Sequence, residues 1–328
     1  MTILAVGNEG DSFTTNFGIT RYQTSCKDPL ARGGIAPTQS QRHTLKLSSA
    51  VSEVWLHGYM YQNTTGDSTT LPLIGFLDSV SPGVDALRLL QIANYTTFQN
   101  SVRAAYWNGS AYVTIAEFSL PSFSSGGSGF EFDIHFKMGS SGRFRMFVER
   151  QLIMDKSGSY TPSISFDTVR FGAPDATGSY YGSIIAADEC TVGLRLDSII
   201  PNATGGGAGW TNATVANLAD TTNAPAVNTA TLASTNAAGS TFLLNYENPA
   251  TFATIREAKG VSVASCGILQ AGSGFTNLFL YVNSVTLGNM SFTPSFTSYQ
   301  QFLATDPATS TAWTNTSISN MTIGAITT

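Results

Sequence analysis

The clearest signal of fold class is the segment Phe130-Glu-Phe-Asp-Ile-His-Phe-Lys-Met-Gly-Ser-Ser-Gly-Arg-Phe-Arg-Met-Phe-Val-Glu149. Its first half alternates with a period of two, so that one face carries Phe132, Ile134, Phe136 and Met138. The opposite face carries Glu131, Asp133, His135 and Lys137. This period is typical of a strand with one buried face. After a Gly/Ser turn at 139–142, residues 143–149 alternate in the same way, which predicts a second, antiparallel strand.

Short strands continue in both directions from this pair. Residues 102–107 and 111–118 flank Asn108-Gly109, and an Asn-Gly pair accepts the positive φ angles of a hairpin turn. In the second half of the chain, we expect strands at the apolar segments 241–246, 261–263 and 278–282. Residues 84–93 fit a short helix or a strand. The sequence therefore predicts an all-β protein of two β-sandwich, jelly-roll-like domains.

Charged residues are spread unevenly, which predicts the domain organisation. Residues 1–200 carry 14 Lys and Arg and 17 Asp and Glu, whereas residues 201–328 carry only Arg256 and Lys259 against four acids. The change falls at the Gly-rich segment 201–209, whose composition is typical of a flexible linker. We therefore expect one β-sandwich over 1–200, a linker over 201–209 and a smaller β-sandwich over 210–328.

The composition argues against several classes of function. A net charge of −5 leaves no basic surplus to neutralise phosphates, so no nucleic-acid partner is expected. No apolar run approaches the roughly 20 residues of a membrane helix, and the first residues lack the basic segment of a secretion signal. Cys26, Cys190 and Cys266 lie far apart, so neither a disulfide framework nor a zinc site is predicted. We expect no membrane partner and no cofactor.

Residues 130–149, followed by Leu152–Gly158, resemble the central strands of a concanavalin-A-like or laminin-G-like sandwich. The segments that are similar to its closing strands are Phe166–Gly172 and Tyr181–Thr191. In virion proteins of tailed bacteriophages, the last of these often precedes a Pro, a Gly-rich segment and a Trp, here Pro201, Gly205–Gly209 and Trp210. The phage-like pattern continues in Ile255-Arg256, Val261–Val263 and Asp306-Pro-Ala-Thr-Ser-Thr-Ala-Trp-Thr314.

The resemblance implies a non-enzymatic structural component of a tailed-phage virion. The expected place is capsid decoration, a head fibre, a collar or a tail-associated protein, made in the host cytoplasm. The expected partners are other virion proteins and further copies of the chain, because a homo-oligomer repeats one interface by symmetry. The alternative is a carbohydrate-binding adhesin or receptor-binding protein that contacts a surface glycan. A divergent glycoside hydrolase is a third alternative.

The pattern Glu131-x-Asp133-x-His135 invites comparison with retaining β-glucan hydrolases, which share the concanavalin-like fold and have a glutamate at the last of these positions. Such enzymes use two carboxyl groups about 5–5.5 Å apart, one as nucleophile and one as general acid. His135 cannot take the place of the second carboxylic acid. We therefore predict no catalytic residue and no enzymatic activity, and we interpret these residues as the polar outer face of an antiparallel strand.

The segment Val54-Trp-Leu-His-Gly-Tyr-Met-Tyr61 separates into an apolar face and a face that carries Trp55, His57, Tyr59 and Tyr61. Aromatic rings with polar tips suit sugar stacking, a subunit interface or a second wall of the core. These four residues and Glu131, Asp133 and His135 are the candidate ligand or interface contacts. Asp188-Glu189 and Asp197 carry oxygen atoms that suit calcium, but such acids lie more often in solvated turns, so no metal site is predicted.

Overall fold

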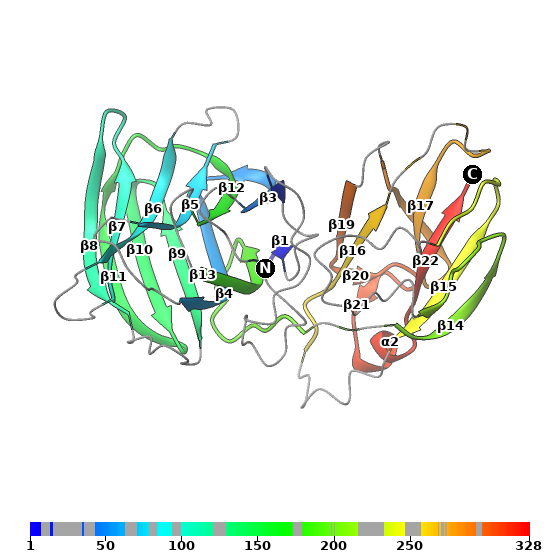
Figure 1. Cartoon of the computed structure of the whole chain (residues 1–328). Coiled ribbons are helices and arrows are strands. Elements are labelled where there is room, and N and C mark those ends of the chain that lie inside the picture. The colour runs from blue at the N-terminus through cyan, green and yellow to red at the C-terminus, as the bar shows by residue number, and fades with distance from the viewer. Residues whose placement is uncertain are drawn as a thin grey trace. The chain divides into compact units, whose positions relative to one another are not determined.

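The structure is a computed structural model of the whole chain (Figure 1). It describes residues 1–7, 14–15, 35, 43–62, 71–78, 84–93, 100–120, 129–172, 179–197, 199, 201–215, 233–246, 257–267, 269, 272, 274–292 and 297–328. Nearly all regular elements are strands, which confirms the predicted all-β fold class. The chain divides into two compact units, Met1–Leu196 and Asp197–Thr328, and each is described by itself.

The first unit is a sandwich of two antiparallel sheets (Figure 1). The six-stranded sheet has the order β1-β13-β4-β9-β10-β11, with the bounds Ile3–Gly7, Ser179–Ala187, Glu53–Gln62, Phe130–Lys137, Gly139–Val148 and Gln151–Tyr160. The seven-stranded sheet has the order β2-β3-β12-β5-β6-β7-β8, with the bounds Thr14–Thr15, His43–Val51, Phe166–Phe171, Leu71–Leu77, Asp85–Ala93, Asn100–Trp107 and Tyr112–Ser119.

The core lies between these sheets and is built from the apolar positions of the alternating strands. Phe132, Ile134 and Phe136 of β9 are fully buried, as their spacing predicts. The ring of Phe136 lies 6.0 Å from that of Phe76 in β5 and 6.1 Å from that of Phe166 in β12. Burial of each large apolar side chain contributes about 1.5–3 kcal/mol. This layer therefore holds the sheets together and decides which face of β9 points away from the core.

The apolar face of β4 packs into the same core through Val54, Leu56 and Met60. Between them lies Gly58, where a Cβ atom would come within 2.5 Å of the Ile184 side chain and 2.7 Å of the Phe132 ring. A larger residue at this position would therefore displace the side chains of the two neighbouring strands, β13 and β9. The segment that fitted helix or strand is strand β6, because β5 and β7 both pair with it.

Asn108 closes the hairpin between β7 and β8 that the Asn-Gly pair predicts. The last strand pair is Trp107 with Tyr112, so the loop covers residues 108–111 and is longer than a two-residue turn. The Asn108 Oδ1 atom accepts hydrogen bonds from the backbone N–H groups of Ser110 and Ala111, at 3.0 and 2.8 Å. These side-chain hydrogen bonds, typical of Asn in turns, set the loop length.

The second unit is built around a five-stranded antiparallel sheet of order β14-β15-β22-β17-β18, with the bounds Pro201–Ala208, Thr241–Tyr246, Thr322–Thr327, Leu278–Val282 and Val285–Asn289. Two smaller pairs are β16 with β19 (Val261–Gly267 and Thr297–Leu303) and β20 with β21 (Thr305–Asp306 and Thr311–Ala312). The strands predicted at 241–246, 261–263 and 278–282 are confirmed. Among the described residues, no helix is long and apolar enough to cross a membrane.

The Gly-rich segment is not a linker, and this part of the sequence-based prediction is wrong. Residues 201–208 form β14, which pairs with β15. A Cβ atom at Gly207, whose φ is +129°, would lie 2.4 Å from the backbone oxygen of Thr241. Glycine lets β14 approach β15 this closely, so a composition that suits flexibility also suits a strand with irregular pairing. That residues 210–328 fold independently stays a prediction.

Residues 306–314 form a compact turn that precedes the short helix before the last strand. The Asp306 Oδ1 atom accepts from the backbone N–H of Ala308 at 3.0 Å, and β20 and β21 pair across this turn. Trp313 is buried, and its Nε1–H donates to the backbone oxygen of Leu303 at 2.8 Å. Helix α2 (Asn315–Ser319) follows, with Thr314 as its N-cap. Trp313 therefore anchors the turn to the core of the second unit.

His43, the first residue of β3, is a buried polar group in the first unit. Its side chain is fully buried, and neither ring nitrogen has a hydrogen-bond partner in the part of the chain that the structure describes. Burial disfavours the charged imidazolium form and lowers the pKa of His43 from 6.5 to about 4. The native state therefore holds His43 neutral at a pH where the unfolded chain already binds a proton.

We expect the free energy of unfolding to fall as the pH drops from 6.5 towards 4. In this window the unfolded state binds more protons, so stability rises with pH, and the His43 contribution amounts to about 3 kcal/mol. Chemical denaturation at stepwise pH would measure it. His43→Phe should remove this part of the slope, although His135, whose pKa burial also lowers, keeps a smaller contribution. Parallel slopes for the two proteins would contradict the assignment.

Candidate functional site

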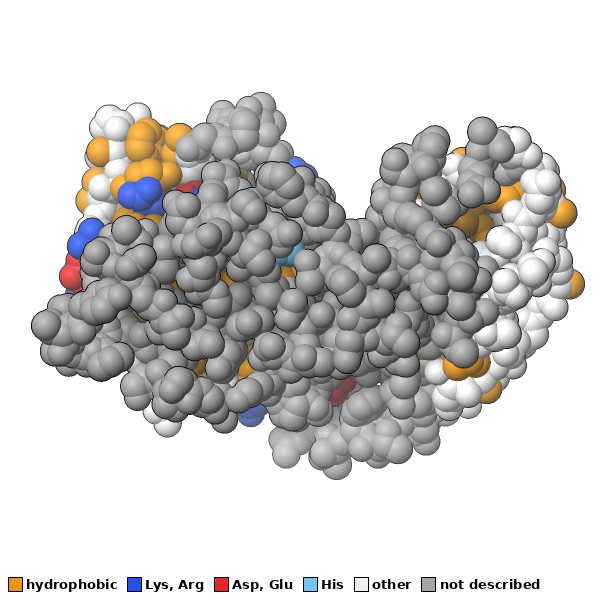
Figure 2. Space-filling model, viewed as in Figure 1, with side chains coloured by type: hydrophobic (Ala, Val, Ile, Leu, Met, Phe, Trp, Pro, Cys, Tyr) orange, Lys and Arg blue, Asp and Glu red, His pale blue; other side chains and the backbone are white. Residues whose placement is uncertain are grey.

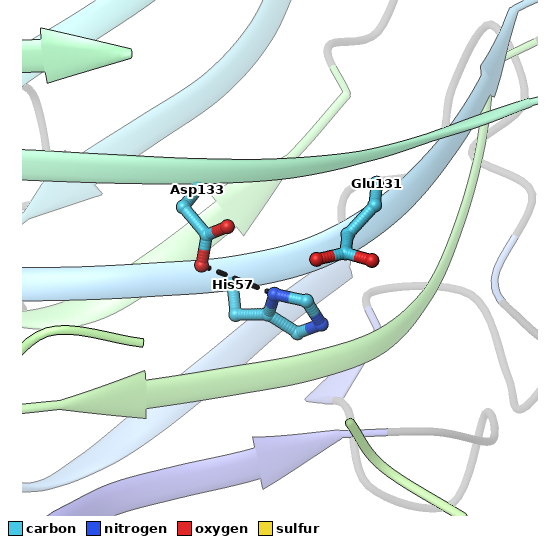
Figure 3. A group of neighbouring side chains, drawn as sticks. All are labelled: His57, Glu131 and Asp133. Atoms are coloured by element: carbon cyan, nitrogen blue, oxygen red, sulfur yellow. Dashed lines mark hydrogen bonds and ion pairs between the residues drawn. The ribbon is translucent and has the colours of Figure 1, made fainter. Parts of the chain in front are cut away.

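Strand pairing brings most of the candidate residues together on the face of the six-stranded sheet that points away from the core. In the pairing of β4 with β9, Trp55 lies opposite His135, His57 opposite Asp133, and Tyr59 opposite Glu131. All six side chains lie on the outer face because the intervening residues fill the core. We call His57, Glu131 and Asp133, which Figure 3 shows as one group, the outer-face cluster.

Asp133 is the buried member of the outer-face cluster and is fully inaccessible to solvent. Its Oδ1 atom accepts from the Thr191 hydroxyl at 2.7 Å and lies 3.1 Å from Nδ1 of His57. Its Oδ2 atom has no hydrogen-bond partner among the residues that the structure describes. Burial of a carboxylate is costly unless its oxygens are paired. The face points away from the core, as the sequence predicts, but Asp133 and His135, which is 5% exposed, are buried on it.

Glu131 lies at the rim of the cluster, where 18% of its side chain is exposed. The guanidinium group of Arg150 donates to both of its carboxylate oxygens, at 3.2 and 3.3 Å. The backbone N–H of Glu131 donates to the Glu149 Oε1 atom at 2.9 Å. The backbone N–H of Glu149 donates to the backbone carbonyl oxygen of Glu131, also at 2.9 Å. Glu131 is therefore held by the two residues of the β10–β11 turn.

That turn has an unfavourable backbone. Glu149 and Arg150 connect β10 to β11, and both adopt positive φ angles, 48° and 66°. A two-residue hairpin turn of this type favours Asn-Gly, because other side chains clash with the backbone in the left-handed region. Such outliers cluster at functional sites, where the surrounding structure holds them in place. Here the chain keeps two charged residues at a position that glycine would fit better, and both contact Glu131.

Trp55 and His135 form a buried stack beside the cluster. Their rings lie 4.4 Å apart and nearly parallel, and Phe147 of β10 packs on Trp55 at 5.9 Å. Nε2 of His135 lies 2.9 Å from a Glu53 carboxylate oxygen. Burial lowers the pKa of His135, although the hydrogen bond to Glu53 acts in the opposite direction. With Trp55 only 8% exposed, this pair supports the sheet rather than presenting a surface.

Of the two tyrosines of the aromatic face, Tyr59 is the one whose side chain the structure describes. Tyr59 is half-buried beside Glu131, and a Cβ atom at Gly129 would lie 2.4 Å from its ring. Tyr61 pairs with Tyr180 through the backbone, but its side chain lies outside the described residues. Tyr59 is thus the aromatic ring that borders the outer-face cluster.

The site includes three residues that the sequence-based selection missed. Glu149 and Arg150 have a signal in the sequence, since they form a charged pair at the break between two alternating strands. Thr191 has none, because it reaches Asp133 only through the fold of the chain after β13. Of the acids considered for calcium, Asp188 accepts from the backbone N–H of Thr2 at 2.5 Å, which lowers its pKa.

Of the three cysteines, Cys190 is the one whose side chain the structure describes. Cys190 is an exposed free thiol. Cys26 lies outside the described residues, and so does the side chain of Cys266. The predicted absence of a disulfide framework stays a prediction.

Comparisons with known proteins concern the fold. No family model and no curated protein matches the chain. A carbohydrate-binding module, CBM66 from Bacillus subtilis, is similar in structure with 12% identity and a TM-score of 0.33, covering 54% of this chain and 94% of the module. The CBM2 module of the evolved Dit protein of Lactobacillus casei BL23 phage J-1 has 13% identity and a TM-score of 0.37, covering 56% and 96%. The alginate lyase Aly36B has 16% identity and a TM-score of 0.36, covering 60% and 100%.

These comparisons contradict the sequence-based prediction that the protein is not an enzyme, because structures of an alginate lyase are among those of similar fold. The prediction rested on His135 in place of a second glutamate. One strand position does not decide what the other polar groups on the same face can do, and the structure places Asp133, His57 and Glu131 together there.

We expect the double substitution Glu149→Asn with Arg150→Gly to raise the free energy of unfolding by about 1 kcal/mol. The gain comes from relief of two positive φ angles and exceeds the loss of an exposed ion pair. Chemical denaturation measures it, and Ser284→Gly is a matched control, since Ser284 has a φ of 67° in the β17–β18 turn away from the cluster. A drop in stability for the double variant alone would show that the contacts to Glu131 outweigh the backbone cost.

Proposed function

We propose that the first unit is a carbohydrate-binding domain and that its glycan lies against the outer face of the six-stranded sheet, at Glu131, Arg150 and Tyr59. The observation that carries this proposal is the arrangement of Glu131. Its carboxylate lies at the rim, beside a half-buried aromatic ring, and is fixed by a turn whose backbone is unfavourable. Small-molecule sites typically combine a few convergent polar groups with an aromatic or apolar wall.

The chemistry of these groups suits sugar hydroxyls, which both donate and accept hydrogen bonds. The Glu131 carboxylate accepts only and the Arg150 guanidinium donates only, so together they match a pair of neighbouring hydroxyls. Their mutual hydrogen bonds of 3.2 and 3.3 Å are longer than the about 2.7–2.9 Å of strong charge-assisted bonds. Both groups can therefore exchange part of this contact for a ligand. The ring of Tyr59 offers an apolar face with a polar tip beside them.

The residues beneath the rim make the site rigid before any ligand binds. Glu131 is hydrogen-bonded to Glu149 through both of its backbone groups, and Asp133 is held by Thr191 and His57. Rigid side chains lose little conformational freedom on binding, which favours affinity. The resemblance to concanavalin-A-like domains implies the same class of ligand, and carbohydrate-binding modules are among the proteins of similar fold.

We expect Glu131→Gln to weaken glycan binding by the full-length protein at least tenfold, because a hydrogen bond to a charged group contributes about 1.5–3 kcal/mol. A glycan array would identify the ligand, and titration calorimetry would give the ratio of affinities. Glu117→Gln is the matched control, because Glu117 forms an ion pair with Arg103 on the seven-stranded sheet, away from the cluster. Equal affinity of Glu131→Gln and the control, or no glycan bound at all, would contradict the proposal.

We further propose that this domain acts in a tailed-phage particle, as the sequence resemblance implies, with other virion proteins and copies of itself as partners. The low charge of the second unit supports this role, since residues 201–328 carry six charged residues. In Figure 2 the described part of its visible face is mostly white, the colour of backbone and uncharged polar side chains. A surface with so few charges favours association, because charge repulsion keeps proteins apart.

We expect electron microscopy of purified particles to place the chain at symmetry-related positions, with the second unit against other subunits. Hydrogen exchange offers a second measurement. Backbone amides of the second unit should be more protected in the particle than in the free chain. Absence of the chain from purified particles would contradict the particle role and leave the glycan proposal standing.

A further inference from the structure

Three donor atoms on the outer face of the sheet lie close enough to share one ion. His57, Glu131 and Asp133 each offer one ligand atom, and these atoms lie within 4.8 Å of one another. The residues come from two paired strands, and the Glu131 carboxylate points towards the ring of His57 (Figure 3). The backbone pairing of β4 and β9 thus brings one nitrogen ligand and two oxygen ligands to a single point.

Asp133 gives an independent reason to expect a cation. The residue is fully buried, and Oδ2 has no hydrogen-bond partner among the described residues. Figure 3 shows this oxygen on the side of Glu131, turned away from the bond to His57. An unpaired oxygen on a buried carboxylate is costly, and a bound cation is one of the few partners that compensates for it.

The contact between His57 and Asp133 already has a spacing close to that of two ligands of one ion. Nδ1 of His57 lies 3.1 Å from Oδ1 of Asp133. Nδ1, the ring nitrogen that faces the carboxylate, can bind an ion through its lone pair when the ring proton is on Nε2. Oδ2 of Asp133, which has no hydrogen-bond partner among the described residues, is a further oxygen that the ion can take.

The charges around the cluster favour a divalent ion. Glu131, Asp133 and Glu149 are acidic. Arg150 is positively charged and contacts the Glu131 carboxylate. The formal charges of Glu131, Asp133, Glu149 and Arg150 sum to −2. The ion pair between Arg150 and Glu131 is long and exposed, with 54% of the Arg150 side chain accessible. Exposed ion pairs contribute little, so Glu131 can leave Arg150 for an ion.

We propose that His57, Glu131 and Asp133 bind a divalent transition-metal ion of the zinc class. A histidine nitrogen with two carboxylates suits Zn²⁺, whereas Ca²⁺ and Mg²⁺ prefer oxygen ligands alone. Ligand atoms at about 2.0–2.1 Å from a tetrahedral zinc ion lie roughly 3.4 Å apart, so Glu131 moves inward when the ion binds. Three protein ligands leave a fourth position open towards the rim, where a glycan hydroxyl would coordinate; this last step rests on the proposed function.

Titration calorimetry of the metal-free, full-length protein with ZnCl₂ tests the site. A Cys190→Ser background removes the exposed thiol, which could bind zinc adventitiously. We expect one Zn²⁺ per chain, affinity at least tenfold lower for Glu131→Gln, and no change for Glu117→Gln. Substitution of His57 disturbs a buried pair, so circular dichroism should first show that His57→Gln is folded. In a titration with Co²⁺, the bound cobalt ion should show the visible absorption bands expected for nitrogen and oxygen ligands.

The outcomes separate the metal site from the proposed function. Saturable zinc binding that Glu131→Gln weakens supports the site, even if the protein binds no glycan. Absence of saturable binding by the folded protein overturns it, and so does binding that Glu131→Gln leaves unchanged. Glycan affinity measured with and without EDTA tests the open position. If affinity stays equal while zinc binds at the cluster, coordination of the glycan hydroxyl is overturned but the ion site stands.

Discussion

The pairing of β4 with β9 in one register is the constraint on which the first unit depends. Because Phe132, Ile134 and Phe136 are buried in the core, every second residue of β9 must point away from it. The register then places His57 opposite Asp133 and Tyr59 opposite Glu131. A shift of one residue would turn the phenylalanines outward and bury the charged residues in the core, so packing of the core specifies the geometry of the outer face.

Burial of Asp133 distinguishes this face from an ordinary solvated strand face. Thr191 and His57 satisfy one carboxylate oxygen, while the other has no partner among the described residues. At the rim, the turn Glu149-Arg150 keeps a strained backbone and contacts Glu131. Such local costs persist where the surrounding fold supports them, and functional sites are where they concentrate. The combination motivates both the glycan site and the ion site.

The second unit shows how a few charges suffice for a folded domain. Its described core includes Leu280, Val282, Trp313 and Ile323, and the five-stranded sheet begins with the Gly-rich strand β14. Asp306, one of its five acids, is buried and accepts hydrogen bonds from Asn283 and from the backbone of Ala308. This acid thus stabilises a turn in a unit that has few charged residues.

The sequence by itself determined the strands of residues 130–149, the faces of β4 and the hairpin at Asn108, because alternation and turn chemistry are properties of neighbouring residues. It also singled out Trp55, His57, Glu131, Asp133 and His135. Three features depend on the tertiary structure: His57 contacts Asp133 across 76 positions, Thr191 donates a hydrogen bond to Asp133, and residues 201–208 form a strand. Pairing partners and burial depend on segments far apart in the chain, which no local pattern encodes.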